Sequence, residues 1–251
     1  MQNAIERSPV AYARLAGVFY LFIIVVGVAS EVFVRDPLVV AGDATATALN
    51  VAAAETLWRA SVAGQVAYLA LAVVVNLILY TLLRRVNRPV AQLAAMFNVV
   101  SIAVEVVVRL MLVAPLVLAD RPGIALAALP PEQRHALAYF FVRMHEYGFG
   151  FSLVFFGGVC LCWGWLIRKS GFMPATIGWL MQLAGACYLV NSFAVLLSPA
   201  LASQLFPAIL LPAFVGEVAL CLWLLGRGLD DARWRLRDAD GIPAAATGGA
   251  R

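Results

Sequence analysis

Ionisable side chains occur at intervals inside long apolar stretches of this sequence. The candidates for contacting a ligand are Glu31, Arg59, Glu105, Arg109, Arg143, His145, Glu146 and Glu217. A charged group in membrane hydrocarbon costs about 2.5–3.5 kcal/mol on insertion scales, so each of these residues needs an explanation. Side chains of these types can transfer a proton, hold an ion, or bind a phosphate or carboxylate group.

Charge and spacing relate several of these residues to one another. Glu105 and Arg109 are four residues apart, which favours an ion pair on one helix face, and holding two helices in register is the simpler role for that pair alone. The acids in the apolar stretches outnumber the bases when Glu31, Glu105, Glu146 and Glu217 are counted against Arg109 and Arg143. Either some of these acids carry a proton, or a cation or basic ligand completes the site.

The sequence predicts neither a metal site nor a cofactor. His145 and Glu146 match the start of the zinc motif H-E-x-x-H, but Phe149 stands where the second histidine is needed. The cysteines lie in apolar stretches without C-x-x-C spacing, and they are Cys160, Cys162, Cys187 and Cys221. We interpret them as small buried apolar side chains.

The elements that must position these residues are membrane-spanning helices. The chain has 251 residues, of which 63% are hydrophobic and 13% charged, and its mean hydropathy is +0.91. A typical soluble domain is about 45–50% apolar and about 25% charged. The composition therefore excludes a soluble enzyme, a nucleic-acid binder and a disordered chain, and the unbroken apolar runs exclude a β-barrel. The prediction is an all-α polytopic protein whose surroundings are the lipid bilayer.

Each spanning helix requires about 20 mostly apolar residues. We predict one six-helix transmembrane domain over residues 1–228, with spans near 15–34, 60–83, 91–118, 139–167, 175–197 and 205–225. Residues 43–54 are predicted to form a short interfacial helix capped by Asp43, and Pro130–Pro131 to start a new helix. Residues 229–251 are predicted to form a disordered tail.

Basic residues set the expected orientation. They follow the even-numbered spans, at Arg84, Arg85, Arg88, Arg168, Lys169, Arg227, Arg233, Arg235 and Arg237. The positive-inside rule then places both termini in the cytoplasm. Because successive helices run in opposite directions, several candidates fall in the outer half of the membrane, namely Glu31, Arg59, Arg109, His145 and Glu217. We expect them to line a water-accessible polar pocket that opens away from the cytoplasm.

Two further patterns concern helix packing. The second span places polar and aromatic side chains on one stripe, at Trp58, Gln65, Tyr68 and Asn76. The fourth span repeats glycine every seven residues, at Gly150, Gly157, Gly164 and Gly171. Small residues at such intervals are typical of close contact between membrane helices, which is the role that we predict for these glycines.

Several short motifs, in their order and spacing, resemble the DUF4386 family of bacterial membrane proteins. They are residues 13–35 (ARLAGVFYLFIIVVGVASEVFVR), 42–47 (GDATAT), 57–59 (LWR), 145–148 (HEYG), 155–157 (FFG), 170–174 (SGFMP), 216–217 (GE) and 222–225 (LWLL). The likeness covers nearly all of residues 10–228. It implies a multi-pass protein of a bacterial inner membrane and supplies no activity and no catalytic residues.

Three functions stay open from the sequence. The favoured hypothesis is non-enzymatic, a protein that binds or transports a small molecule, lipid or cation through the polar pocket. The second is an intramembrane enzyme acting on a lipid or isoprenoid, with His145 or Glu146 as general base and Arg109 or Arg143 holding a phosphate or carboxylate. The third is an accessory or sensor subunit whose buried charges fix a partner helix.

Overall fold

The computed structural model describes residues 2–118 and 128–237, which are all-helical. Within these residues, six helical segments are long and apolar enough to cross a membrane: Pro9–Leu38, Glu55–Leu83, Arg88–Leu118, Pro131–Ser170, Ala175–Leu197 and Ala208–Gly226. The predicted number of spans is confirmed. Several helices extend beyond the predicted limits, because polar residues continue the helix past the apolar run at one or both ends.

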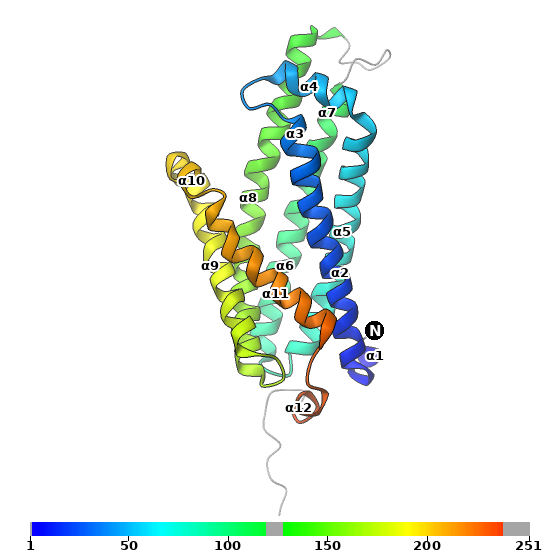
Figure 1. Ribbon diagram of the computed structural model, residues 1–251, viewed down its shortest axis with the longest axis vertical. Helices are drawn as coiled ribbons and strands as arrows, with labels where there is room; N and C mark the ends of the chain where they lie inside the picture. The colour runs from blue at the N-terminus through cyan, green and yellow to red at the C-terminus, as the bar shows by residue number, and fades with distance from the viewer. Residues whose placement is uncertain (1, 119–127, 238–251) are drawn as a thin grey trace, which may run out of the picture.

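Two of the six segments are interrupted by short stretches of a different helical pitch. The first consists of α2 (Pro9–Ser30), a π-helical turn (Glu31–Arg35) and α3 (Asp36–Leu38). The third consists of α6 (Arg88–Arg109), a 3₁₀ turn (Leu110–Val113) and α7 (Ala114–Leu118). Both interruptions lie in the half of the molecule that is farther from the N-terminus (Figure 1).

The remaining segments are regular helices: α5 (Glu55–Leu83), α8 (Pro131–Ser170), α9 (Ala175–Leu197) and α11 (Leu211–Gly226). The sixth span was predicted to start at residue 205, but α10 (Pro199–Leu205) is a separate helix and α11 starts after it. Pro207 and Pro212 flank this junction, and each removes a backbone donor that a continuous helix would need.

The six segments form a closed ring of neighbours. α2 packs on α5, α5 on α6, α6 on α8, α8 on α9, α9 on α11, and α11 returns to α2. In Figure 1 α11 crosses the front of the bundle at a steep angle, between α9 on one side and α2 on the other. Every span thus has two adjacent spans against which it can bury polar side chains, while its outer face stays apolar.

Glycines bring α8 and α9 into backbone contact. A methyl group added at Gly157 would lie 3.0 Å from the carbonyl oxygen of Gly185, and one added at Gly185 would lie 2.6 Å from that of Gly157. Gly164 and Gly178 face each other in the same way one heptad further along. The predicted packing role is confirmed for Gly157 and Gly164 but not for Gly150, which has no neighbouring atom within 4 Å of that position.

The two chain ends that the structure describes lie at the same end of the bundle (Figure 1). This end, here the terminal end, contains α1 (Gln2–Arg7), α12 (Asp231–Arg235) and the turn that follows Gly171, whose φ of 74° ends α8. Trp234 of α12 is fully buried and donates a hydrogen bond to the carbonyl oxygen of Leu82 at 3.0 Å.

This docking corrects the prediction that the chain is disordered from residue 229. Residues 229–237 are held against the bundle because Trp234 fits between the spans and Arg85 lies 3.8 Å from the centre of its ring. Arg233 and Arg237 add hydrogen bonds to the backbone carbonyls of Gly171 and Lys169, at 3.1 and 2.6 Å. Residues 238–251, the rest of the predicted tail, lie outside the described residues.

The opposite end of the bundle carries α4 (Ala44–Ala53), which packs on α8. Its predicted cap is confirmed, since the Asp43 carboxylate accepts a hydrogen bond from the Ala46 backbone at 2.8 Å. The predicted helix start at Pro130–Pro131 is also confirmed, because α8 begins at Pro131.

Large apolar side chains cover much of the outer surface of the bundle. Examples are Phe33, Met96, Leu110 and Leu197, whose exposed fractions are 69, 69, 68 and 81%. In the window that defines the first span, only 22% of the residues are buried. Hydrocarbon tolerates such a surface and water does not, so the fold is that of a multi-pass membrane protein.

Candidate functional site

The core of the site is an ion pair on α6. Arg109, which is 5% exposed, donates from Nη2 to Glu105 Oε2 at 2.9 Å, as the four-residue spacing predicts. Tyr68 of α5 joins the pair: its hydroxyl accepts from Arg109 Nη2 and donates to Glu105 Oε2 at 3.2 Å. The predicted polar stripe on α5 therefore includes a tyrosine, Tyr68, whose hydroxyl contacts both members of the ion pair.

His145 of α8 connects this pair to α2. Its Nε2 contacts Arg109 Nη1, and its Nδ1 lies 2.9 Å from Nη1 of Arg35. Arg35 in turn is paired with Glu31, donating from Nε to Oε1 at 3.2 Å and from Nη2 to Oε2. The Ser152 hydroxyl also donates to Glu105 Oε1, at 3.5 Å. We call six of these connected side chains the polar network; they are Glu31, Arg35, Tyr68, Glu105, Arg109 and His145.

The polar network is buried unequally. His145 is fully buried and the Arg109 side chain nearly so, whereas the side chains of Arg35 and Glu31 are 17 and 44% exposed. Glu105 has a 14% exposed side chain. The network thus has a closed end on α6 and an accessible end on α2.

Both interrupted helices meet at the polar network. The π-helical turn starts at Glu31 and ends at Arg35, and the 3₁₀ turn follows Arg109 directly. Short π-helical stretches in α-helices occur frequently at functional sites, and a stretch of 3₁₀ helix inside a longer helix often marks a hinge. The network is therefore located where the backbones of two spans depart from regular hydrogen bonding.

Not all of the predicted site residues join the polar network. Arg143 and Glu146 pair with each other on α8, with side chains 46 and 34% exposed, and Glu146 is within electrostatic range of Arg35 and Glu31. Arg59 pairs with Glu55 at 2.7 Å on α5, and its side chain is 49% exposed. The structure thus places Arg143 and Glu146 at the edge of the network and Arg59 apart from it.

Glu217 of α11 forms a second cluster of hydrogen bonds between the spans. Its carboxylate accepts hydrogen bonds from the hydroxyls of Tyr20 on α2, at 3.2 Å, and Tyr188 on α9. Glu105 is close enough to Glu217 for their charges to interact. Glu217 is a neighbour of the polar network and exchanges no hydrogen bond with it among the described residues.

The structure changes the count of acidic against basic residues that was made from the sequence. Arg35 was not counted there, and it compensates Glu31, as Arg109 compensates Glu105 and Arg143 compensates Glu146. Within the part of the chain that the structure describes, Glu217 is then the one candidate acid without an ion-pair partner. The spacing of Glu31 and Arg35 contained this signal, whereas nothing in the sequence points to Tyr188.

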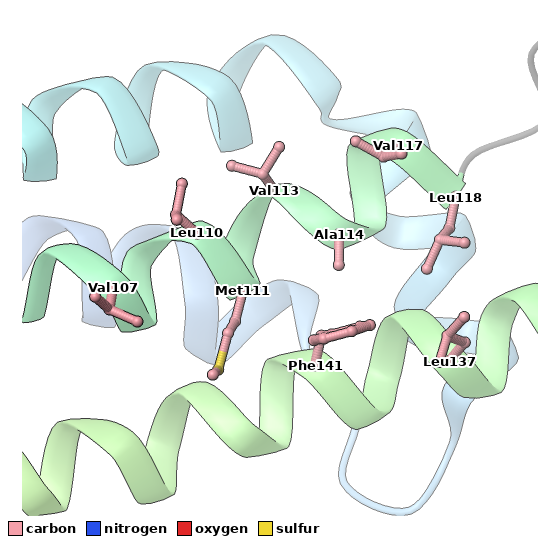
Figure 2. Close-up of a pocket in the computed structure, with 9 residues that line it drawn as sticks. All are labelled: Val107, Leu110, Met111, Val113, Ala114, Val117, Leu118, Leu137 and Phe141. Carbon is pink, nitrogen blue, oxygen red and sulfur yellow. The ribbon is translucent and has the colours of Figure 1, made fainter. Parts of the chain in front are cut away.

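The polar pocket expected from the sequence stays a prediction. A groove of about 440 Å³ lies between the α6–α7 segment and α8, but its lining is apolar, with Val107, Leu110 and Met111 on one side and Leu137 and Phe141 on the other (Figure 2). Phe141 stands one helical turn before His145, so the groove approaches the network along α8.

The chain was compared with protein families, curated proteins and solved structures. A family model described as "Domain of unknown function (DUF4386)" matches residues 15–228. Neither a curated protein nor a solved structure matches the chain.

Proposed function

Because this chain belongs to the DUF4386 family, whose description names no activity, we propose its function from the site: the protein binds or transports a small molecule or lipid at the polar network. The sequence also leaves a cation open as the ligand. A cation is less favoured by the contacts, because Arg35 and Arg109 balance the acids of the network. Among the candidate acids that the structure describes, Glu217 alone has no ion-pair partner.

One observation carries the proposal: charged side chains from two spans, a histidine from a third and a tyrosine from a fourth form a single connected network next to two irregular helical turns. Buried ion pairs contribute little to stability, because desolvating the charges costs about as much as their attraction returns. Holding the helices together therefore does not require them. A site that must bind a polar group inside the membrane does require such side chains.

We further propose that the terminal end faces the cytoplasm of a bacterial cell. The basic residues of α12 and of the two turns beside it gather at this end, in agreement with the positive-inside rule. The polar network then lies in the half of the membrane that faces away from the cytoplasm, and the protein resides in the inner membrane with both termini inside.

The contacts favour binding over catalysis. A general base needs an accessible nitrogen or carboxylate within reach of the substrate proton. His145 is fully buried and both of its ring nitrogens contact arginines, while Glu146 is paired with Arg143. Comparing the lipids of cells with and without the gene tests the enzyme hypothesis, because an enzyme changes the identity of a lipid and a transporter changes its distribution.

The proposal is tested by identifying what co-purifies with the full-length protein. Purified wild type, Glu105→Gln and Glu217→Gln are extracted with organic solvent and the extracts are compared by mass spectrometry. Glu55→Gln is the matched control, because Glu55 also pairs with an arginine four residues away but lies outside the network. Only samples that elute as a single symmetric peak on size exclusion are compared.

We expect a compound that is present with wild type and Glu55→Gln and reduced with Glu105→Gln. Equal amounts of every co-purified compound in all samples would refute the proposal. So would the absence of any enriched compound, if Glu105→Gln and Glu217→Gln also transport candidate ligands at the wild-type rate. A stoichiometric protein partner in place of a small compound would instead support the accessory-subunit hypothesis.

A further inference from the structure

Hydrogen-bond donors outnumber acceptors around His145. Arginine has only donors, and a neutral imidazole has one nitrogen that donates and one that accepts. Arg35 and Arg109 nevertheless approach the two different nitrogens of the same ring. One of these two contacts therefore sets an N–H group against another N–H group, whichever tautomer His145 adopts.

The surroundings identify which contact lacks an acceptor. Arg109 is buried and held in place by Glu105 and Tyr68, so its Nη1 cannot turn to another acceptor. We therefore assign Nε2 of His145 as the nitrogen that accepts a hydrogen bond from Arg109. The ring proton then resides on Nδ1 and points toward the guanidinium of Arg35. A second buried donor, Nε of Arg109, has no hydrogen-bond partner among the described residues.

We infer that an oxyanion, a carboxylate or phosphate group of the ligand, binds to Arg35 and Nδ1 of His145 and takes the place of their direct contact at 2.9 Å. An oxygen there accepts from both groups and removes the mismatch, and the guanidinium fork of arginine matches the two oxygens of a carboxylate or phosphate. This inference rests on the proposed function and specifies the chemical class of its ligand.

Glu31 shows how Arg35 holds a carboxylate. It engages Arg35 through both of its oxygens, at Nε and Nη2. Arg35 and Glu31 form the accessible end of the network, so a ligand can approach Arg35 without displacing Arg109. The ligand oxyanion then competes with Glu31 for the positive charge of one guanidinium, because Glu31 occupies Nε and Nη2 while the ligand accepts from Nη1, the nitrogen that faces His145.

This competition gives opposite expectations for two variants. Arg35→Gln removes the charged donor and should weaken anion binding by about tenfold or more. Glu31→Gln removes the competing carboxylate and should strengthen anion binding. A purely structural ion pair predicts instead that the two variants behave alike. Arg59→Gln is the matched control, since it alters an arginine paired at the same spacing outside the network.

The test measures the thermal unfolding midpoint of the full chain by its tryptophan fluorescence. One arm titrates detergent-solubilised protein with sodium benzoate or sodium phosphate, against sodium chloride at equal ionic strength. The other arm compares phosphatidylcholine bilayers with bilayers that also contain phosphatidylglycerol. A shift in the first arm identifies a soluble anion, and a shift confined to the second arm identifies a lipid headgroup, whose chain the apolar groove in Figure 2 can receive.

In either arm we expect the shift to be lost in Arg35→Gln, to occur at lower anion concentration in Glu31→Gln, and to persist in Arg59→Gln. No shift in both arms overturns the inference, and so does a shift that Arg35→Gln leaves unchanged. If Arg35→Gln does not fold, Glu31→Gln decides, because a weaker response than that of wild type contradicts competition. A co-purified compound that is cationic or uncharged and is lost in Glu105→Gln would overturn the inference while supporting the proposed function.

Discussion

Two glycines of α2 have opposite surroundings, and replacing each by alanine tests how α2 packs on α11. A methyl group at Gly17 would lie 2.8 Å from Cα of Leu225 and 2.9 Å from the carbonyl carbon of Leu224, whereas ordinary contacts are 3.4–4 Å. These are backbone atoms, so they cannot move aside as a side chain can. A methyl group at Gly27 would meet nothing within 4 Å.

The expected effects differ in sign. Overpacking costs about 1–3 kcal/mol, and the unyielding backbone contacts at Gly17 place this site in the upper part of that range, at about 2–3 kcal/mol. Alanine recovers about 1 kcal/mol of helix propensity relative to glycine. Gly17→Ala should therefore lower the free energy of unfolding by about 1–2 kcal/mol. Gly27→Ala gains the propensity without the contact and should raise it by about 0.5–1 kcal/mol. The same substitution on one helix thus gives a difference of about 2–3 kcal/mol.

The assay is reversible denaturant unfolding in detergent micelles, followed by tryptophan fluorescence, for wild type and both variants. Gly17→Ala also separates α2 from α11 near Tyr20 and Glu217, so any ligand response that depends on Glu217 should weaken with it. If both alanine variants are stabilised alike, the backbones of α2 and α11 are not in contact at Gly17 and the packing described for this part of the ring is wrong.

Three further predictions use the same unfolding assay. Trp234→Ala should lower the free energy of unfolding by about 3–5 kcal/mol and Trp234→Phe by about 1–3 kcal/mol. Both variants leave the Leu82 carbonyl without its donor, but only alanine also leaves a cavity, so equal losses would contradict this explanation. Glu105→Gln should cost about 3 kcal/mol by leaving the Arg109 charge buried, and adding Arg109→Gln should recover part of it; additive costs would show that the pair is not coupled. Gly171→Ala should cost about 1–2 kcal/mol, since φ is 74° there; an unchanged midpoint would mean that the turn tolerates a side chain.

The sequence was sufficient for the helices because their signals are local. The apolar runs predict six spans, and Asp43 and Pro131 mark helix starts that the structure shares. The docking of α12 was not predictable in this way, because Trp234 is a single aromatic residue in a basic segment. Its burial depends on a site formed by other spans that meet it only in the folded protein.

The site was predictable in part for the same reason. Pairs on one helix, such as Glu105 with Arg109, follow directly from their spacing. The role of His145 as the link between Arg35 and Arg109 requires knowing that α8 lies beside both α6 and α2, which spacing along one helix does not encode. The expected depth in the membrane was also too weak a criterion for grouping site residues, because it grouped Arg59 with residues that Arg59 does not contact in the structure.

The length of α8 has a mechanical consequence for the site. With 40 residues α8 is about 60 Å long, twice the roughly 30 Å of bilayer hydrocarbon, and His145 lies about 21 Å from its first residue. An uninterrupted helix of this kind behaves as a rod. A displacement of α4, or of the first turns of α8 that project beyond the hydrocarbon, would therefore tilt α8 as a whole. The tilt would move the His145 ring relative to Arg35 and Arg109, while the backbone hydrogen bonds of α8 stay intact.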